Sequence, residues 1–315
     1  MKVFVLLNSD SLAIPSLTKL SAEGKLSGLA VVAESSDRLI PKIKASGIKE
    51  AIYILKKQTW IETLQSAYES TKAEQVWIFT FPWKIPDELL MISPKGFYNF
   101  HFGLLPKYKG ADPIFWQLKN REEFGGLSVH KVTDQMDSGP LVLQKQLPVI
   151  PGEGYGFHCQ RLGQFCAELL PEIVGGIDNN TVIEGQLGGQ TGWWNKPSEK
   201  DLTINWERMD ADEIEWLINA TNPKYGGART SVGDTKMLIR EVTSVNLEQE
   251  AEALPGTIVH SDAVYGIIVA CRNGGFLRIT IAEIEEGLVS GVKLFNLGMH
   301  KGHRFNNISS PKEMV

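Results

Sequence analysis

The sequence predicts an α/β protein, with an N-terminal Rossmann-like parallel sheet and a smaller C-terminal β-barrel domain. Through the first half, apolar β-branched strands alternate with amphipathic helices. Through the second half, short strands are separated by turn residues, which is typical of a small barrel. A polar, glycine-rich stretch over residues 179–200 lies between the halves, and 315 residues are enough for two domains.

The first half consists of successive βαβ patterns. Residues 2–8 are continuously apolar and β-branched, as in a strand that is buried on both faces. Further strands are expected at 29–33, 51–55, 75–81 and 97–101, and helices at 12–20, 35–47, 60–68 and 156–177. Right-handed crossovers make such strands parallel, so we expect strand 97–101 to be the fifth and to lie centrally in the sheet.

The second half begins with a helix over residues 210–220, which Asp210 caps and Pro223 ends. Five strands are expected after it, at 228–232, 236–245, 256–260, 266–271 and 275–283. We therefore place a first domain at 1–178, a linker at 179–200 and a second domain at 201–315. Trp193 and Trp194 are expected to anchor the linker to one of the domains.

Composition excludes several classes of protein. The net charge of −5 gives no general attraction to nucleic acid or anionic membranes. Three cysteines without a C-x-x-C pair favour a reducing, cytoplasmic compartment over a disulfide framework, and no metal site is expected. No apolar run approaches membrane-spanning length, and Lys2–Leu7 is too short for a signal-peptide core. Composition sets no oligomeric state.

Nucleotide-cofactor motifs are also missing from the expected positions. No G-x-G-x-x-G follows the first strand, and no Walker A lysine loop occurs. Gly152, Gly154 and Gly156 follow a strand but lack the required spacing, so we interpret them as a flexible connection. A nicotinamide or ATP cofactor is therefore not expected.

Candidate catalytic residues stand at the end of the fifth predicted strand. Asn99 and His101 are two residues apart and project from one face, just before a Gly/Pro-rich loop. Ligands of open α/β sheets sit outside such strand ends. A second strand over 126–132 leads into an acidic loop that carries Asp137 and a Ser-Gly-Pro turn. Asn99 or His101 alone would usually be a turn residue or a satisfied polar group. The segment that carries them, taken together with the segment that carries Asp137, favours a functional site.

The two segments resemble the signature of formyltransferases that use 10-formyltetrahydrofolate. That family carries Asn-x-His-x-Ser-Leu-Leu-Pro and, further on, an Asp before a Gly-containing turn. Here Asn99, His101, the turn Gly103–Pro106 and Asp137 match, and Gly103 stands where the family usually has Ser. The resemblance implies the formyltransferase fold for the N-terminal domain, with Asn99, His101 and Asp137 as catalytic residues.

The resemblance extends over nearly the whole chain and implies a folate pocket. The opening Ala13–Leu17 is similar to the family's, and the second half resembles the OB-like C-terminal domain of methionyl-tRNA formyltransferases. The cosubstrate implied is 10-formyltetrahydrofolate, without a metal. The residues implied to line its site are Phe81, Pro82, Trp83, Lys84 and Ile85 on one wall, Gly103, Leu104, Leu105 and Pro106 in the turn, and Gln135 and Met136 opposite. We assign His130 no role.

Formyl transfer passes through a tetrahedral oxyanion, and this chemistry assigns the three roles. Asn99 offers an amide donor to the oxyanion, an interaction worth about 2.7–4 kcal/mol. His101 can donate to the same oxygen and pass a proton to the departing folate nitrogen. Asp137 must lie within roughly 3 Å of the imidazole, or one water away, to orient it or to accept the proton that the amine loses.

The amine acceptor is the open question, and two features argue against tRNA. Methionyl-tRNA formyltransferases carry a long basic insertion after their second strand, whereas here 32–38 leads straight into a helix. Residues 201–315 contain 11 Lys and Arg against 16 Asp and Glu, a net charge of −5 that is unfavourable for tRNA. A small or carrier-linked amine, as in the sugar-nucleotide N-formyltransferases, is therefore preferred.

Two alternatives to transfer onto a small amine stay open beside transfer to methionyl-tRNA. The formyl-folate hydrolases resemble this core, but they carry a small regulatory domain at the N-terminus. No such extension precedes Met1, so we expect hydrolysis less than transfer. A non-catalytic folate-binding module is the other alternative.

Overall fold

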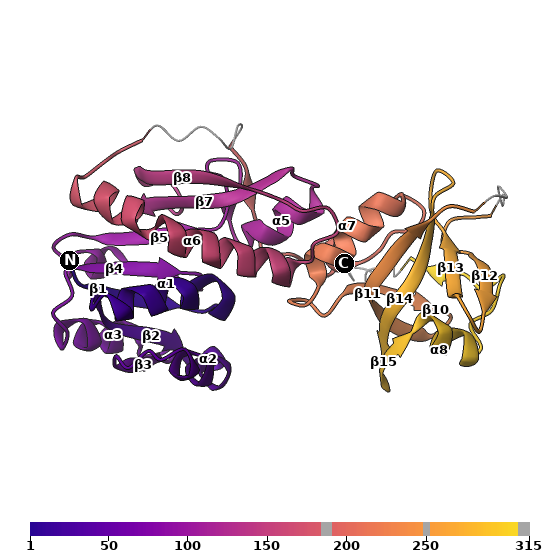
Figure 1. Cartoon of the computed structure of the whole chain (residues 1–315), viewed down its shortest axis with the longest axis horizontal. Coiled ribbons are helices and arrows are strands. Elements are labelled where there is room, and N and C mark those ends of the chain that lie inside the picture. Colours follow the sequence, from indigo (N-terminus) through magenta and orange to yellow (C-terminus); the bar gives the residue numbers. More distant parts are fainter. Residues whose placement is uncertain (184–190, 248–252, 308–315) are drawn as a thin grey trace, which may run out of the picture. The chain divides into compact units, whose positions relative to one another are not determined.

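The computed structural model describes residues 1–183, 191–247 and 253–307 of the chain. The chain divides into two compact units, whose elements are labelled in Figure 1. The first unit comprises Met1–Pro113, Phe124–Pro148 and His158–Trp194; the second comprises Ile114–Glu123, Val149–Phe157 and the chain from Asn195 onward.

This division is less simple along the chain than the predicted domains at 1–178 and 201–315. Two short segments before residue 178 group with the second unit. Residues 184–190 of the predicted linker lie outside the described residues. The domain boundaries therefore stay a prediction.

The first unit is built on a sheet of seven strands in the order β3-β2-β1-β4-β5-β7-β8. These strands are β1 (Val3–Leu7), β2 (Leu26–Val32), β3 (Ile52–Leu55), β4 (Gln75–Phe79), β5 (Phe97–His101), β7 (Phe124–Lys131) and β8 (Leu141–Pro148). The five strands β3, β2, β1, β4 and β5 are parallel to one another. Strand β7 is antiparallel to both of its neighbours, β5 and β8. The predicted α/β fold with a mainly parallel sheet is confirmed.

Two details of this sheet differ from the prediction. The strands β7 and β8 form a hairpin, because the loop between them is too short for a parallel crossover. Strand β5 lies inside the sheet, but the middle position belongs to β4, since only the hairpin is added beyond β5.

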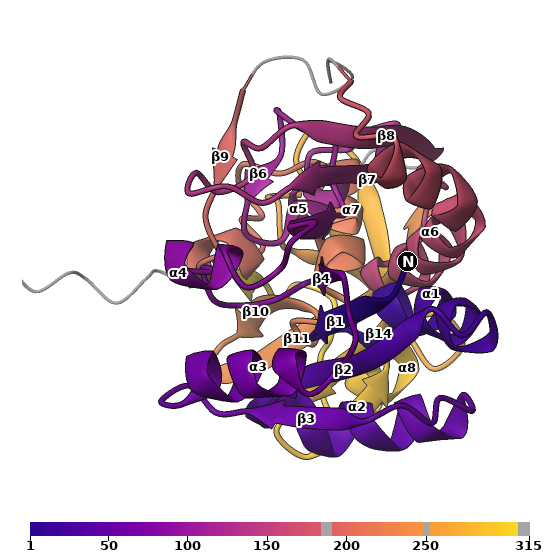
Figure 2. The ribbon, with the colours of Figure 1, turned by 90° about the vertical axis from the view of Figure 1, so that its left-hand side faces the viewer.

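Helices cover both faces of this sheet, as Figure 2 shows nearly end-on to the strands. They are α1 (Asp10–Ala22), α2 (Ala33–Ala45), α3 (Trp60–Glu69), α4 (Asp87–Leu90) and α6 (Tyr155–Asp178), and the chain also forms the short helix α5 (Pro113–Lys119). Helices α1, α2 and α6 lie on one face, and α3 and α4 lie on the other. Helix α6 approaches α1 closely at Gly163, where a Cβ atom would lie 1.9 Å from the carbonyl oxygen of Ser11. The short helix α5 was not predicted.

The second unit contains an antiparallel sheet in the order β12-β13-β14-β11-β10-β16, with β15 paired to β14. Its elements are η1 (Glu199–Leu202), α7 (Ala211–Thr221), β10 (Ala228–Val232), β11 (Thr235–Val245), β12 (Ile258–Asp262), β13 (Gly266–Ala270), β14 (Phe276–Ile284), β15 (Gly287–Ser290), α8 (Gly291–Asn296) and β16 (Phe305–Asn306). An isolated bridge between Thr257 and Arg304 joins the segments that precede β12 and β16. The five predicted strands and a barrel-like second domain are confirmed.

Candidate active site

Strand β5 presents two polar side chains, Asn99 and His101, on one face of the first sheet. Strand alternation puts both on the side of Phe97. The ring of Phe97 packs in an apolar cluster with Trp60 and Leu64 of α3. The two polar side chains therefore face the α3 side of the sheet. Helices α1 and α6 lie on the opposite side (Figure 2). His101 ends the strand and is 6% exposed.

The loop between β7 and β8 places Asp137 next to Asn99 and His101 on this face. Its Oδ1 lies 3.3 Å from Asn99 Nδ2 and 3.6 Å from His101 Nδ1, and its Oδ2 accepts a hydrogen bond of 2.9 Å from the Gly110 amide. The backbone of Asp137 has φ +52°, a left-handed conformation that Asp tolerates better than most residues. The three residues predicted from the sequence thus converge on one carboxylate that is 6% exposed.

His130, to which the sequence analysis gave no role, completes this cluster. Strand β7 pairs with β5 so that His130 lies directly opposite Asn99. Its Nε2 is 3.2 Å from Asn99 Nδ2 and 3.5 Å from Asp137 Oδ1, and the residue is 2% exposed. Local pattern marks His130 only as a polar residue in an apolar strand. The register between two strands, which brings it to Asn99, has no short-range sequence signal.

Two backbone carbonyl groups determine which ring nitrogens carry protons. His101 Nε2 lies 2.6 Å from the Tyr108 carbonyl oxygen, which can only accept, so Nε2 is the protonated nitrogen. The nitrogen that gains or loses a proton is then Nδ1, which faces Asp137. His130 Nδ1 donates in the same way to the Lys131 carbonyl at 3.0 Å. In the neutral ring, His130 Nε2 is therefore an acceptor for the Asn99 amide.

Burial and neighbouring charges set the protonation of the pair His101 and Asp137. Burial lowers the pKa of His101 below its ordinary value, against the attraction of Asp137. Burial acts to raise the pKa of Asp137, but the charge of His101, the hydrogen bond with His130 and the Gly110 amide together hold that pKa well below its usual range. Asp137 is thus an ionised carboxylate at neutral pH, beside an imidazole that can take up a proton.

A buried hydrogen-bond network holds the turn that follows β5. The Ser128 hydroxyl donates to the Gly103 carbonyl at 2.6 Å and accepts from the Leu105 amide at 3.2 Å. The Gln144 amide donates to the Leu105 carbonyl at 2.7 Å and to Ser128 Oγ at 3.0 Å. Because Ser128 lies opposite His101 in the ladder, this network fixes the turn relative to β5.

The sequence profile of a family described as formyl transferase matches residues 17–174 of the chain, about half of its length. A methionyl-tRNA formyltransferase from Dictyoglomus thermophilum is 32% identical over 227 residues, which cover 70% of this chain and 69% of that protein. The chain belongs to the formyl transferase family. The resemblance inferred from the Asn99, His101 and Asp137 segments is therefore confirmed.

Solved structures agree with this membership at the level of the fold. HypX from Aquifex aeolicus, in complex with tetrahydrofolic acid, superposes with a TM-score of 0.65 at 14% identity, over 96% of this chain and 48% of that one. This chain thus spans about half the length of HypX. An N-formyltransferase from Helicobacter canadensis, in complex with folinic acid and dTDP-3-aminofucose, gives a TM-score of 0.61 at 17% identity, over 88% of this chain and 98% of that one.

The Gly103 that departs from the formyl transferase signature has a steric reason in this chain. A Cβ atom at Gly103 would lie 2.9 Å from His101 Nε2 and 2.8 Å from the Cβ of Pro113. The serine that the family usually carries has no room here. The absence of a side chain allows His101 Nε2 to reach the Tyr108 carbonyl.

The residues predicted to hold folate occupy three kinds of environment. Phe81 and Trp83 are half-buried, and the ring centroid of each lies 5.4 Å from the ring centroid of Trp60. The buried residues are Ile85, Gly103, Leu104 and Leu105. The half-buried residues are Phe81, Trp83 and Pro106, and the exposed residues are Pro82, Lys84, Gln135 and Met136. Side-chain contact with a ligand is open to the exposed and half-buried residues, and main-chain contact to the rest.

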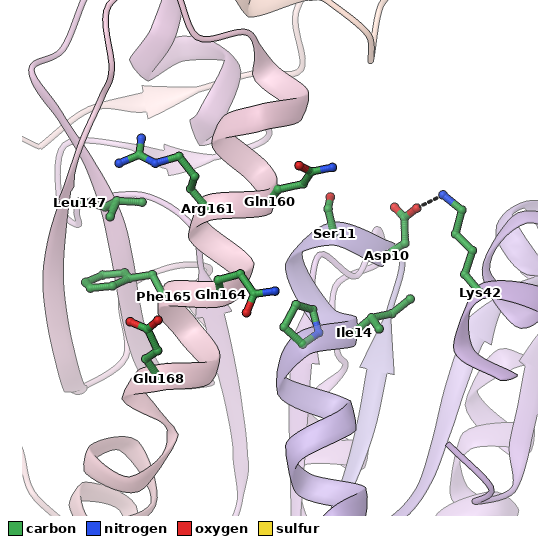
Figure 3. A pocket seen from close by; sticks show the side chains of 11 residues that line it. Asp10, Ser11, Ile14, Lys42, Leu147, Gln160, Arg161, Gln164, Phe165 and Glu168 are labelled. Carbon is green, nitrogen blue, oxygen red and sulfur yellow. Dashed lines mark hydrogen bonds and ion pairs between the residues drawn. The ribbon is translucent and has the colours of Figure 1, made fainter. Parts of the chain in front are cut away.

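A groove of about 730 Å³ lies on the opposite face of the same unit (Figure 3). Ser11 and Ile14 of α1 line one side, and Gln160 and Gln164 of α6 line the other. Asp10 at the start of α1 forms an ion pair with Lys42 of α2 across its end. Since Asn99 and His101 point to the α3 face, this groove is separated by the sheet from the cluster around Asp137.

Other chemistries find few candidates among the residues described. No group of three or more His, Cys, Asp or Glu side chains in these ranges is placed to hold a metal ion. Cys159, Cys166 and Cys271 are buried, and burial raises the pKa of the Cys166 and Cys271 thiols to about 12. No helix in the described part of the chain has the length and apolar character needed to cross a bilayer.

Proposed function

We propose that this formyl transferase moves the formyl group of 10-formyltetrahydrofolate to a small or carrier-linked primary amine, such as an amino-sugar nucleotide. The observation that carries the proposal is the buried Asp137 carboxylate, on which Asn99, His101 and His130 converge. A folate donor is supported by the related folds of HypX and the Helicobacter canadensis enzyme, which were solved with tetrahydrofolic acid and folinic acid.

The reaction requires one bond to form and one to break. The amine nitrogen attacks the formyl carbon, and the formyl oxygen becomes the oxyanion of a tetrahedral adduct. The bond between that carbon and folate N10 then breaks, which leaves an N-formyl amide and tetrahydrofolate. The amine loses one proton and N10 gains one, so the site must carry a proton from one nitrogen to the other.

Asn99 supplies the donor for the oxyanion in this proposal. In the absence of substrate its two amide hydrogens point to Asp137 Oδ1 and His130 Nε2. When substrate binds, the formyl oxygen takes the place of one of these two acceptors for an Asn99 hydrogen. A donor placed in this way is worth about 2.7–4 kcal/mol of transition-state stabilisation.

His101 and Asp137 carry the proton. Nδ1 of His101 faces Asp137 Oδ1 at 3.6 Å, longer than a direct hydrogen bond, so contact is made through a small shift or one water. Asp137 accepts the proton that the amine loses and passes it to His101 Nδ1, which returns Asp137 to its ionised form. The resulting imidazolium then delivers a proton to N10. The neighbouring ionised carboxylate stabilises the imidazolium that forms in between.

A folate pocket is proposed beside this cluster, on the α3 face. The rings of Phe81 and Trp83 with Trp60 form an aromatic wall, and the Lys84 and Ile85 backbone follows it. The exposed Gln135 and Met136 precede Asp137 in the loop that covers the same face. The buried turn at Leu104 and Leu105 forms the floor.

Three observations favour a small amine as the acceptor. Strand β2 ends at Val32 and α2 begins at Ala33, which leaves no loop for the basic insertion of methionyl-tRNA formyltransferases. Residues 201–315 have a net charge of −5, whereas tRNA binding is driven by phosphate neutralisation. The Helicobacter canadensis enzyme, solved with an amino-sugar nucleotide, is covered over 98% of its length.

Methionyl-tRNA is the second candidate acceptor, because the Dictyoglomus thermophilum relative at 32% identity carries that name. Three assays separate the candidates. Consumption of 10-formyltetrahydrofolate is followed with amino-sugar nucleotides, with methionyl-tRNA, and without any amine. Formylation of an amino-sugar nucleotide is expected. Transfer to methionyl-tRNA alone overturns the preferred acceptor, and formate release without amine indicates a hydrolase. Tight folate binding without turnover indicates a binding module.

A further inference from the structure

A two-residue strand that precedes η1 is attached to the loop that follows β5. Strand β9 (Trp193–Trp194) pairs in parallel with β6 (Lys109–Gly110). The Lys109 amide donates to the Gly192 carbonyl at 3.1 Å, and the Ala111 amide donates to the Trp194 carbonyl at 2.8 Å. Figure 2 shows this small ladder on the same side of the sheet as α3 and α4.

The Trp194 side chain adds two contacts to the same loop. Its indole ring stacks on Tyr108 with centroids 5.7 Å apart and an interplanar angle of 18°. Its Nε1 donates to the Lys107 carbonyl at 3.1 Å. Backbone and side chain of Trp194 thus hold Lys107, Tyr108 and Ala111 at once.

This loop carries the backbone groups that hold both members of the proton-transferring pair. The Tyr108 carbonyl accepts from His101 Nε2 at 2.6 Å, and the Gly110 amide donates to Asp137 Oδ2 at 2.9 Å. We propose that Trp194 is a positioning residue of the formyl-transfer site, which acts through Tyr108 and Gly110 on His101 and Asp137. The proton transfer by His101 and Asp137 rests on the proposed function. The contacts that link Trp194 to them, which we call the mechanical link, do not.

The fit of the ladder shows that the two segments are shaped for each other. Gly110 has φ +100°, and a Cβ atom there would lie 2.3 Å from the Trp194 carbonyl oxygen. A Cβ atom at Gly192 would lie 2.5 Å from the Lys107 carbonyl oxygen and 3.1 Å from Trp194 Nε1. Glycines at both positions permit the close approach that puts the Gly110 amide against Asp137.

Removal of the indole leaves the catalytic side chains in place and loosens only what orients them. A displacement of about 1 Å in a reacting group is enough to slow a reaction about 100-fold. We therefore expect Trp194→Ala to lower kcat about 10- to 100-fold, with little change in KM for 10-formyltetrahydrofolate. Trp194→Phe keeps an aromatic ring on Tyr108 and should recover most of the loss.

The matched control is Trp193→Ala on the same strand. Trp193 is 55% exposed, so its removal should leave kcat within about twofold of the wild type. Thermal unfolding of all three variants checks that the full chain folds.

A titration that needs no substrate tests the mechanical link directly. His101 is faced by Asp137, His130 and the Tyr108 carbonyl, and burial lowers its pKa. NMR of labelled histidines in the unliganded protein, with the His101 signal assigned through His101→Asn, follows its titration. In Trp194→Ala the pKa of His101 should move up toward its ordinary value, because a loosened loop admits water. Trp193→Ala should leave that pKa unchanged.

The outcomes separate this inference from the proposed function. A fall in kcat together with a shifted His101 titration, both recovered by Trp194→Phe, supports the positioning role. An unshifted titration overturns it, even if Trp194→Ala is less stable or less active, because its effect is then general destabilisation. If the wild type transfers no formyl group, the proposed function fails, and the titration alone still decides the link between Trp194 and His101.

Discussion

Asp137 is the residue on which the candidate site depends most directly. Its two oxygens meet Asn99, His101, His130 and the Gly110 amide, and its backbone lies in the left-handed region. A buried carboxylate without such partners would be protonated or displaced. Charge and geometry at this position are therefore linked, and they can be separated by substitution.

Asp137→Asn removes the charge with little change in shape, and Asn tolerates a positive φ, which Ala does not. We expect kcat to fall about 10²–10⁴-fold, the usual contribution of a general acid–base group. The KM for 10-formyltetrahydrofolate should change little. Steady-state kinetics measure both values, with Asp234→Asn in an exposed turn as the control. Full activity of Asp137→Asn would remove the carboxylate from the mechanism.

Gly103→Ser restores the residue that formyl transferases usually carry, and here it should be harmful. The added Cβ would lie 2.9 Å from His101 Nε2 and 2.8 Å from the Pro113 Cβ, so His101 must move. We expect kcat to fall at least tenfold and the unfolding temperature to drop. Gly175→Ser on α6 is the control, since a Cβ atom there meets nothing within 4 Å. A more active Gly103→Ser enzyme would contradict the steric argument.

The buried His101 should make stability fall in mild acid. Because burial lowers the pKa of His101, the unfolded chain binds a proton at pH values where the folded chain does not. This stabilisation is complete above the unfolded pKa of about 6.5 and is lost as pH falls through that value toward the folded pKa. Asp137 stays ionised over this range, since its own pKa is lowered.

Thermal unfolding at pH 7.5 and 5.5 measures this effect. The wild type should lose more stability between these two values than His101→Gln, which has no imidazole to protonate. If both proteins lost the same stability between pH 7.5 and 5.5, His101 would already be protonated in the folded state.

At the scale of elements, the hairpin of β7 and β8 does more than extend the sheet. It carries Ser128, which meets the turn after β5, and Gln144, which meets the same turn from the next strand. It also carries His130 opposite Asn99 and ends β7 where the Asp137 loop begins. The catalytic strand is thus completed by an antiparallel neighbour, which a purely parallel sheet would not supply.

Ser128→Ala tests whether the hairpin fixes the turn that follows β5. It removes a buried hydroxyl that bonds the Gly103 carbonyl, the Leu105 amide and the Gln144 side chain, so each of these groups loses one hydrogen bond. Such losses cost about 1–3 kcal/mol each, so we expect a clearly lower unfolding temperature and a lower kcat. Ser244→Ala, at an exposed position of β11, should change neither. Unchanged stability of Ser128→Ala would show that the network is not needed.

At the scale of the whole molecule, the second unit includes segments from the middle of the chain. Phe115 of α5 is fully buried and contacts Tyr225 edge-on at 5.5 Å, and Lys119 pairs with Asp201 at 3.2 Å. All four residues belong to the second unit. A cut between the predicted domains therefore removes partners of α5.

A fragment of residues 1–200 should consequently be less stable than the full chain. It lacks Tyr225 and Asp201, and so it exposes Phe115 and leaves Lys119 without its carboxylate. Loss of such buried contacts costs several kcal/mol, so we expect an unfolding temperature lower by at least about 5 °C. A fragment as stable as the full chain would show that the first domain is independent, as the predicted boundaries imply.

The sequence by itself determined most strands of the two sheets, the family and the chemical groups of the candidate site. Apolar runs and helical periodicity are local properties, so β1 to β5 and β10 to β14 were predictable from residues near each other. Asn99, His101 and Asp137 were recognisable because they occur in two short segments with fixed spacing. Helix α5 was missed because its pattern is short and follows the breakers at Gly110 and Pro113.

Only the tertiary structure decided what surrounds these groups. His130 meets Asn99 through a strand register, Gly110 meets Asp137 across a loop, and Trp194 meets Tyr108 from 86 positions along the chain. Such contacts depend on which segments pack together, and no local pattern encodes that choice. The sequence thus encodes the groups of the candidate site, while the distances and charges between them arise from the packing of remote segments.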